Sequence, residues 1–199
     1  MGTRKTSLAV VLGCLLGSVS PVVAHPDYTM TCRLQFNFEN GAIGSITQYW
    51  AFDARLSQEF LDEFDGDRDG AFNASESGAL EREVMASLAE VRYLTFVRVG
   101  DNDVGVLSPY DFQATVHDGS STSRSRCACH TRQTRKTDTI KVQVKDVDLL
   151  IGVLYAETDP VLLLGADGWT CSYTIAENAA DAYYGGTVLP EEITLACRR

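Results

Sequence analysis

One acidic stretch, residues 65–76, constrains this chain more than any other feature of its sequence. It reads Asp-Gly-Asp-Arg-Asp-Gly-Ala-Phe-Asn-Ala-Ser-Glu, the spacing of an EF-hand calcium loop. Calcium is a hard cation that takes about six to eight oxygen ligands. The positions expected to supply oxygens are Asp65, Asp67, Asp69, Ala71 through its backbone carbonyl, Asn73 and Glu76. The sequence therefore predicts a Ca²⁺ site on a loop between two helices.

The segments on both sides of this loop have the apolar spacing of helices. Asp53 is a candidate N-cap for the first of them. The apolar positions are Leu56, Phe60, Phe64, Leu80, Val84 and Leu88. We therefore expect an EF-hand-like helix pair over about residues 53–91. The sequence holds one such loop, and Met85 is the only methionine near it, which favours a structural ion over a calmodulin-like switch.

Most of the remaining sequence has strand patterning. Residues 28–38 alternate between apolar and polar, and Asn40-Gly41 then predicts a hairpin turn into a second strand over 42–51. Further strands are expected near 93–99, 111–117, 139–144, 149–155, 161–164 and 169–175, with a last edge strand at 193–197. The predicted fold class is α+β, an antiparallel β-sheet domain with an inserted EF-hand-like helix-loop-helix.

The first 24 residues have the parts of a secretory signal peptide. Arg4 and Lys5 precede an apolar run, and small residues end it at Val22 and Ala24. The run is shorter than the roughly 20 residues that span a bilayer, so we expect no stable membrane span. The sequence thus predicts a cleaved signal peptide (1–24) and one periplasmic or secreted domain (25–199).

Removal of this segment leaves five cysteines, an odd number, in a compartment where disulfide bonds persist. Cys171 and Cys197 lie in two late strand-like segments, and we expect them to pair. Cys32 is expected to pair with Cys127 or Cys129, which leaves one buried thiol. The alternative for Cys127 and Cys129 is a zinc or copper site, although the sequence lacks the spacing of a full set of four ligands. The connectivity therefore stays open.

Charge excludes some classes of partner. The chain has 17 basic and 27 acidic side chains, a net charge of −10, so it is a poor match for a phosphate backbone. Residues 124–136 hold five basic side chains but no interleaved aromatic residue for base stacking. We expect no nucleic-acid partner. The sequence shows no recognisable catalytic motif either, so it does not predict an enzyme.

Cleavage after Ala24 would make His25 the first residue. An N-terminal histidine can chelate a transition metal through its amine and its ring, and Asp27 could add an oxygen. The alternative is a frayed, solvated terminus. His25 and Asp27 are therefore a tentative second metal site.

Several segments, taken in order, resemble an uncharacterised bacterial periplasmic family, a domain of unknown function described as the periplasmic component of an ABC-type transport system. The matching segments are His25-Pro26 and residues 51–53, 65–76, 93–97, 145–151 and 159–171. Asp27 stands where the family has a second histidine, and residues 124–136 depart from the family pattern. The resemblance implies a periplasmic setting, metal handling and a membrane metal transporter as partner.

Together these observations predict a soluble, exported calcium-binding protein, with a role as accessory to a metal-ion transport system implied by the resemblance. One alternative is a structural or interaction domain in which calcium only stiffens the helix pair. The other is an enzyme whose site the sequence does not reveal.

Overall fold

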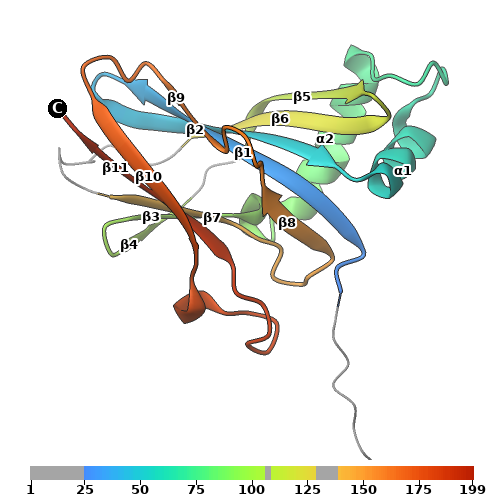
Figure 1. Cartoon of the computed structure of the whole chain (residues 1–199). Helices are drawn as coiled ribbons and strands as arrows, with labels where there is room; N and C mark the ends of the chain where they lie inside the picture. Colours follow the sequence, from blue (N-terminus) through green and yellow to red (C-terminus); the bar gives the residue numbers. More distant parts are fainter. Residues whose placement is uncertain (1–24, 106–108, 129–138) are drawn as a thin grey trace, which may run out of the picture.

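The computed structural model describes residues 25–105, 109–128 and 139–199. The predicted signal peptide lies outside these residues. Within them the chain forms two β-sheets that face each other, with two α-helices near one end of the first sheet (Figure 1). No helix in the described ranges is long and apolar enough to cross a membrane.

Six strands form the first sheet and five form the second, counted over the described residues. Those of the first sheet are β1 (Tyr28–Glu39), β2 (Ala42–Phe52), β5 (Tyr110–His117), β6 (Ser120–Ala128), β8 (Ile151–Tyr155) and β9 (Val161–Leu164). Those of the second sheet are β3 (Thr95–Val99), β4 (Asn102–Val104), β7 (Ile140–Val144), β10 (Thr170–Glu177) and β11 (Glu191–Arg198). Their orders are β5-β6-β2-β1-β8, with β9 also beside β1, and β10-β11-β7-β3-β4.

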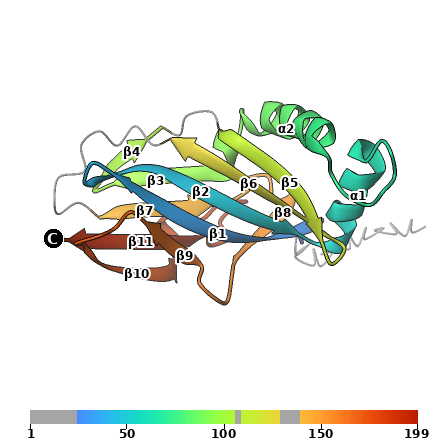
Figure 2. The same cartoon turned by 90° about the horizontal axis from the view of Figure 1, so that it is seen from above.

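The hairpin of β1 and β2 confirms the predicted strands and turn. Asn40 and Gly41 both have positive φ angles, 52° and 77°, as a tight hairpin turn requires. The two strands pair antiparallel from Met30↔Phe52 to Glu39↔Ala42. This hairpin supplies two neighbouring strands in the middle of the first sheet (Figure 2).

On its other side β1 has two parallel partners in succession. β8 pairs with its first part, from Tyr28 to Cys32, and β9 pairs with its second part, from Leu34 to Asn37. The segment that connects β8 to β9 is held against β1 by two backbone hydrogen bonds. Ala156 N–H donates to Cys32 O, and Leu34 N–H donates to Pro160 O, both at 2.9 Å. The first sheet is therefore mixed, which the sequence did not predict.

The core lies between the two sheets. From β1 it receives Met30, Leu34 and Phe36, none more than 1% exposed. Val142 of β7 and Ile193 of β11 face them from the second sheet with no exposed area. Burying an apolar side chain of this size stabilises the fold by about 1.5–3 kcal/mol. This layer of side chains holds the two sheets together.

The predicted α+β fold class with an inserted EF-hand-like helix-loop-helix is wrong. The molecule is mainly a β-sandwich, and its two short helices, α1 (Ala54–Phe64) and α2 (Ala74–Leu88), do not form an EF-hand pair. Each helix packs mainly on the first sheet: α1 on β6 and α2 on β5. Ser121 N–H donates to Ser57 Oγ at 2.8 Å, and Ala114 N–H donates to Ser77 Oγ at 2.9 Å. Helical spacing in the sequence showed that the helices exist but not what they pack against.

Two strand predictions also need correction. β11 was expected at an edge, but it lies between β10 and β7, because its apolar side chains Ile193 and Leu195 join the core. β3 begins at Thr95 rather than Tyr93. Arg92, Tyr93 and Leu94 have left-handed backbone angles, which are incompatible with a strand.

The cysteines confirm one prediction and overturn another. Cys171 and Cys197 form the expected disulfide between the directly paired strands β10 and β11. Cys32 and Cys127 are both buried free thiols, so the predicted disulfide from Cys32 is wrong. Cys32 lies in β1 and Cys127 in β6, with β2 between them, and their register positions are four residues apart, too far for a bridge. Cys129 lies outside the described residues.

Replacing Leu34 with alanine should destabilise the protein by about 2–5 kcal/mol, because it opens a cavity between the sheets. Urea unfolding of the variant measures the loss. Leu154→Ala in the neighbouring strand β8 is the matched control, since Leu154 is 59% exposed and its truncation should stay within about 0.5 kcal/mol. Equal losses in the two variants would contradict the placement of the core.

Iodoacetamide should leave Cys32 and Cys127 unmodified in the native protein at neutral pH. Burial raises the pKa of both thiols, that of Cys127 to about 11, so neither forms the reactive thiolate. Peptide mass spectrometry should find label at both positions only after unfolding in urea. Rapid native labelling of either cysteine would show that its strand is not packed as described.

Candidate metal-binding loop

The loop begins from a helix that is anchored to β1. The Asp53 carboxylate caps α1 by accepting the Leu56 N–H at 2.9 Å, and it also accepts the Thr29 N–H. The Asp53 N–H in turn donates to Thr29 O at 3.0 Å. An aromatic contact also joins α1 to the sheet: the rings of Phe52, at the end of β2, and Phe60 of α1 have centroids 5.3 Å apart. These contacts fix where the helix, and therefore the loop, starts.

Within the loop the Asp65 carboxylate organises the backbone. Its Oδ1 accepts the Asp69 N–H at 3.2 Å and its Oδ2 accepts the Gly70 N–H at 2.9 Å. Gly70 has φ +81°, a left-handed conformation that favours glycine, although a Cβ there would meet no atom within 4 Å. Backbone geometry, rather than lack of space, therefore accounts for glycine at this position.

Glu76 closes the loop from its far end. Its Oε1 accepts the Gly66 N–H at 2.9 Å, and its Oε2 accepts the Asn73 N–H at 2.9 Å. Asn73 caps α2 through Oδ1, which accepts from Ser75 at 2.9 Å and from Glu76 at 3.2 Å. This reciprocal capping box turns the Glu76 side chain back toward the start of the loop.

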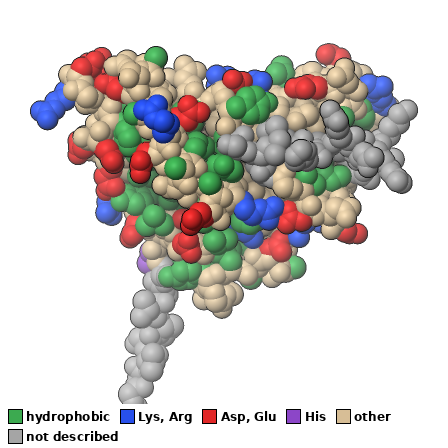
Figure 3. Space-filling model, turned by 180° about the vertical axis from the view of Figure 1, so that it is seen from behind, with side chains coloured by type: hydrophobic (Ala, Val, Ile, Leu, Met, Phe, Trp, Pro, Cys, Tyr) green, Lys and Arg blue, Asp and Glu red, His purple; other side chains and the backbone are tan. Residues whose placement is uncertain are grey.

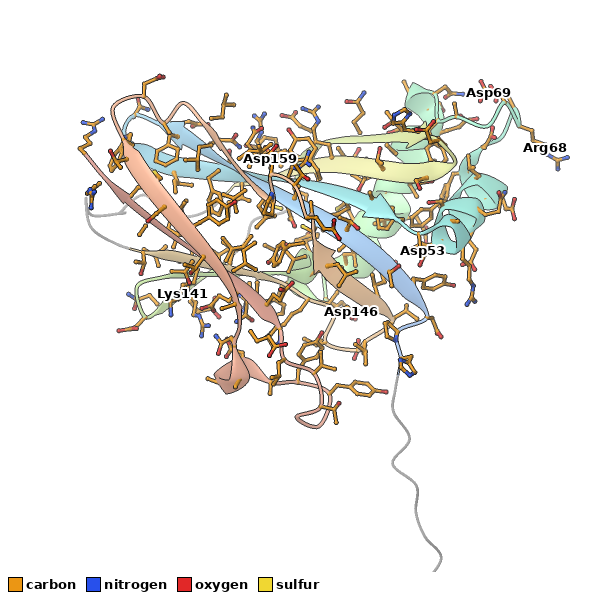
Figure 4. All side chains as sticks on the ribbon, viewed as in Figure 1. Asp53, Arg68, Asp69, Lys141, Asp146 and Asp159 are labelled. Atoms are coloured by element: carbon orange, nitrogen blue, oxygen red, sulfur yellow. A yellow bond between two sulfur atoms is a disulfide. The ribbon has the colours of Figure 1, made fainter. Side chains whose placement is uncertain are left out.

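Three carboxylates meet as a result. Asp65, Asp67 and Glu76 each offer an oxygen within 4.8 Å of the other two. Two oxygens on opposite sides of a calcium ion lie about 5 Å apart, so this donor set fits the ion in size and in chemistry. Asp69, whose Oδ1 accepts the Ala71 N–H, lies with Arg68 at the outer tip of the loop (Figure 4). The structure thus brings together three of the predicted ligands and leaves Asp69 outside this group.

Charge in the loop is uneven. Desolvation raises the pKa of Asp67, and the nearby carboxylates of Asp69 and Glu76 raise it further by repulsion. Desolvation also acts on Asp65, but backbone donors, with Gly70 first, outweigh it and lower its pKa. Like charges that are held together in this way favour binding of a cation.

The other predicted ligands are not assembled into a comparable group. Within the described ranges, only Asp65, Asp67 and Glu76 form a group of three side chains able to hold an ion. His25 and Asp27 are exposed at the start of the described chain, where the Asp27 N–H donates to Leu150 O at 3.0 Å. Their transition-metal role stays a prediction. Cys127 Sγ accepts from Gln48 Nε2 at 3.1 Å, and its predicted partner in a zinc or copper site, Cys129, is outside the described residues.

The second sheet carries a charged cluster that the sequence did not predict. Arg98 Nη2 lies 2.6 Å from carboxylate oxygens of both Asp181 and Glu192. Gln143 Nε2 donates to the same two carboxylates, at 2.6 and 3.0 Å. Asp181 ends a short 3-10 helix (Ala179–Asp181) and is 83 residues from Arg98, so no local sequence pattern predicts the cluster. Both of its carboxylates are therefore already paired with Arg98.

A model of the family described as "Protein of unknown function (DUF1007)" matches residues 10–188, a range that includes the loop. The chain belongs to this family. An uncharacterised 15.5 kDa protein in the trpE 3′ region of Spirochaeta aurantia is 28% identical to it over 121 residues, which cover 61% of this chain and 86% of that protein. The family membership agrees with the domain of unknown function that the sequence resembled. The family description supplies no activity.

The Asp53 contacts predict a dependence of stability on acid. Desolvation acts to raise the pKa of Asp53, but backbone donors outweigh it and lower the pKa. The ionised carboxylate therefore stabilises the folded protein at pH values above the unfolded pKa of about 3.9. This stabilisation is lost as the pH falls through the lower pKa of the folded state. Asp53→Asn should lower the free energy of unfolding at pH 7 by about 1–2 kcal/mol, with the deficit shrinking below pH about 4.

Urea unfolding at a series of pH values measures this effect. Asp62→Asn, the same substitution at an exposed position of α1, is the control and should follow the wild type. A deficit for Asp53→Asn that stays constant down to acid pH would contradict the role of its charge.

Proposed function

We propose that residues 65–76 bind Ca²⁺ and that this ion stiffens the connection between α1 and α2. The observation that carries the proposal is the approach of the Asp65, Asp67 and Glu76 oxygens to within 4.8 Å of one another. Asp69, Asn73 and the Ala71 carbonyl are the remaining ligands that the sequence spacing offers. Calcium supplies no reaction here; it neutralises repelling carboxylates and fixes the loop.

A stiffening role suits the way the two helices are held. α1 is tied to β6 through Ser57 and Ser121, and α2 is tied to β5 through Ser77 and Ala114. A sensor needs helices that are free to separate and expose a groove. Since both helices are hydrogen-bonded to the same sheet, bound calcium would close the loop without opening the helices.

We further propose that the protein acts outside the cytoplasm, in the periplasm or after secretion. The Cys171–Cys197 disulfide supports this location, because such bonds persist in oxidising compartments. A single loop of this kind should have the modest affinity of extracellular calcium modules, a Kd of about 10⁻⁴–10⁻³ M. A metal transporter as partner, and a transition metal at His25 and Asp27, are proposals that rest on the sequence resemblance and the residue types.

Calcium titration tests the proposed site. At a tenfold excess over Kd, bound calcium should stabilise the protein by about 1.4 kcal/mol and raise Tm by about 3–6 °C. Glu76→Gln should abolish both this shift and the heat of binding in calorimetry, because it removes a charged ligand that closes the loop. Magnesium should produce a smaller shift than calcium.

Glu90→Gln is the matched control, since Glu90 is exposed just beyond α2 and lies outside the loop. It should bind calcium as the wild type does. Absence of heat and of a Tm shift at millimolar calcium in the wild type would refute the proposed function.

A further inference from the structure

The outer face of the first sheet, opposite the core, carries a groove of about 440 Å³. Strand register places its lining residues in rows across β1, β2, β6 and β5, which lie side by side in Figure 2. One row runs Arg33↔Tyr49↔Arg124↔Gln113. The next row runs Thr31↔Ala51↔Thr122↔Thr115. A half-buried tyrosine therefore lies between two arginines on the floor of the groove.

These two arginines have no carboxylate partner within the described part of the chain. Arg33 Nη2 donates to the backbone carbonyl of Thr158 at 3.0 Å. Arg124 Nη2 makes a long contact, 3.4 Å, with the neutral Gln113 Oε1. Two other arginines of the sheets have carboxylate partners: Arg98 contacts Asp181 and Glu192, and Arg126 lies 3.5 Å from Asp111.

The missing partners are unexpected in this chain, where acids outnumber basic residues 27 to 17. Acidic side chains are spread over the face seen from behind in Figure 3. Yet the described lining of the groove includes two arginines and no aspartate or glutamate. Arg33 Nε is in addition shielded from solvent and has no hydrogen-bond partner in the structure. A shielded donor of this kind costs free energy unless a ligand satisfies it.

We propose that this groove binds a small organic anion, with its carboxylate or phosphate group between the Arg33 and Arg124 guanidinium groups. Strands two apart in a sheet are separated by about 10 Å, a span that two arginine side chains can close from both sides. The apolar part of the ligand lies against the Tyr49 ring, Ala51 and Ala156, which line the same groove. The Thr122 and Thr115 hydroxyls border the groove and hydrogen-bond to each other at 2.8 Å.

This site is independent of the calcium loop. The groove lies on the outer face of the first sheet, whereas α1 contacts β6 through Ser121, which is buried on the inner face. Loss of calcium binding would therefore leave the proposal intact, and failure of anion binding would not affect the loop.

Nuclear magnetic resonance titration of the full chain with benzoate, phenyl phosphate and neutral benzamide tests the proposal. At least one of the two anions should give saturable shifts at Arg33, Tyr49 and Arg124, and benzamide should bind at least about tenfold more weakly. Saturation by benzoate alone identifies a carboxylate ligand, and saturation by phenyl phosphate alone identifies a phosphate ligand. Equal binding of benzamide, or no binding of either anion, would overturn the proposal.

Two variants distinguish specific anion binding in the groove from non-specific attraction by the charge of the protein. Arg124→Gln should weaken binding of the anion about tenfold or more, since charge-assisted hydrogen bonds to an arginine are lost. Arg82→Gln on the exposed side of α2 removes the same charge away from the groove and should have no effect. Equal weakening by both variants would show non-specific attraction and refute the site. Circular dichroism confirms that each variant is folded, and the comparison of anions with benzamide needs no variant.

Discussion

The alternation of side chains along β1 is the constraint on which the other features depend. Its inward residues, among them Leu34 and Phe36, form the centre of the core, while Arg33 points to the opposite face. The same strand anchors α1, because Thr29 contacts Asp53 at the start of the helix. A slip of one residue in β1 would expose the core residues and bury Arg33. The core, the start of the acidic loop and the groove are therefore positioned by one register.

The two helices show why a loop motif does not determine its surroundings. The inner side of β6 carries the small side chains Ser121, Ser123 and Ser125, all buried. Small residues let a helix approach a sheet closely, and Ser57 bonds to the strand at that point. Phe60, on the apolar stripe of α1, contacts Phe52 at the end of the hairpin. The spacing of residues 65–76 sets the local loop geometry, while the sheet sets the position of each helix.

Sequence alone predicted what depends on neighbouring residues. The Asn40-Gly41 turn and the Asp53 cap follow from local signals, and the structure contains both. The pairing of Cys171 with Cys197, 26 residues apart, was expected only because both lie in late strand-like segments. Features that depend on distant pairing were missed. The parallel strands β8 and β9 beside β1, and the free thiol of Cys32, require the strand order to be known. Arg33 and Arg124 are 91 positions apart, so only the register through Tyr49 brings them into one row.

The acidic loop and the groove differ from the rest of the molecule in how their charges are paired. On the second sheet Arg98 has carboxylate partners on both Asp181 and Glu192, so this fold can neutralise a partly buried charge. It does not do so at Asp67, whose nearest charged neighbours include Glu76, nor at Arg33 and Arg124. In the unliganded loop, like charges held together cost free energy, and a bound cation recovers it. A cation at the loop would neutralise its carboxylates, and an anion in the groove would pair with Arg33 and Arg124.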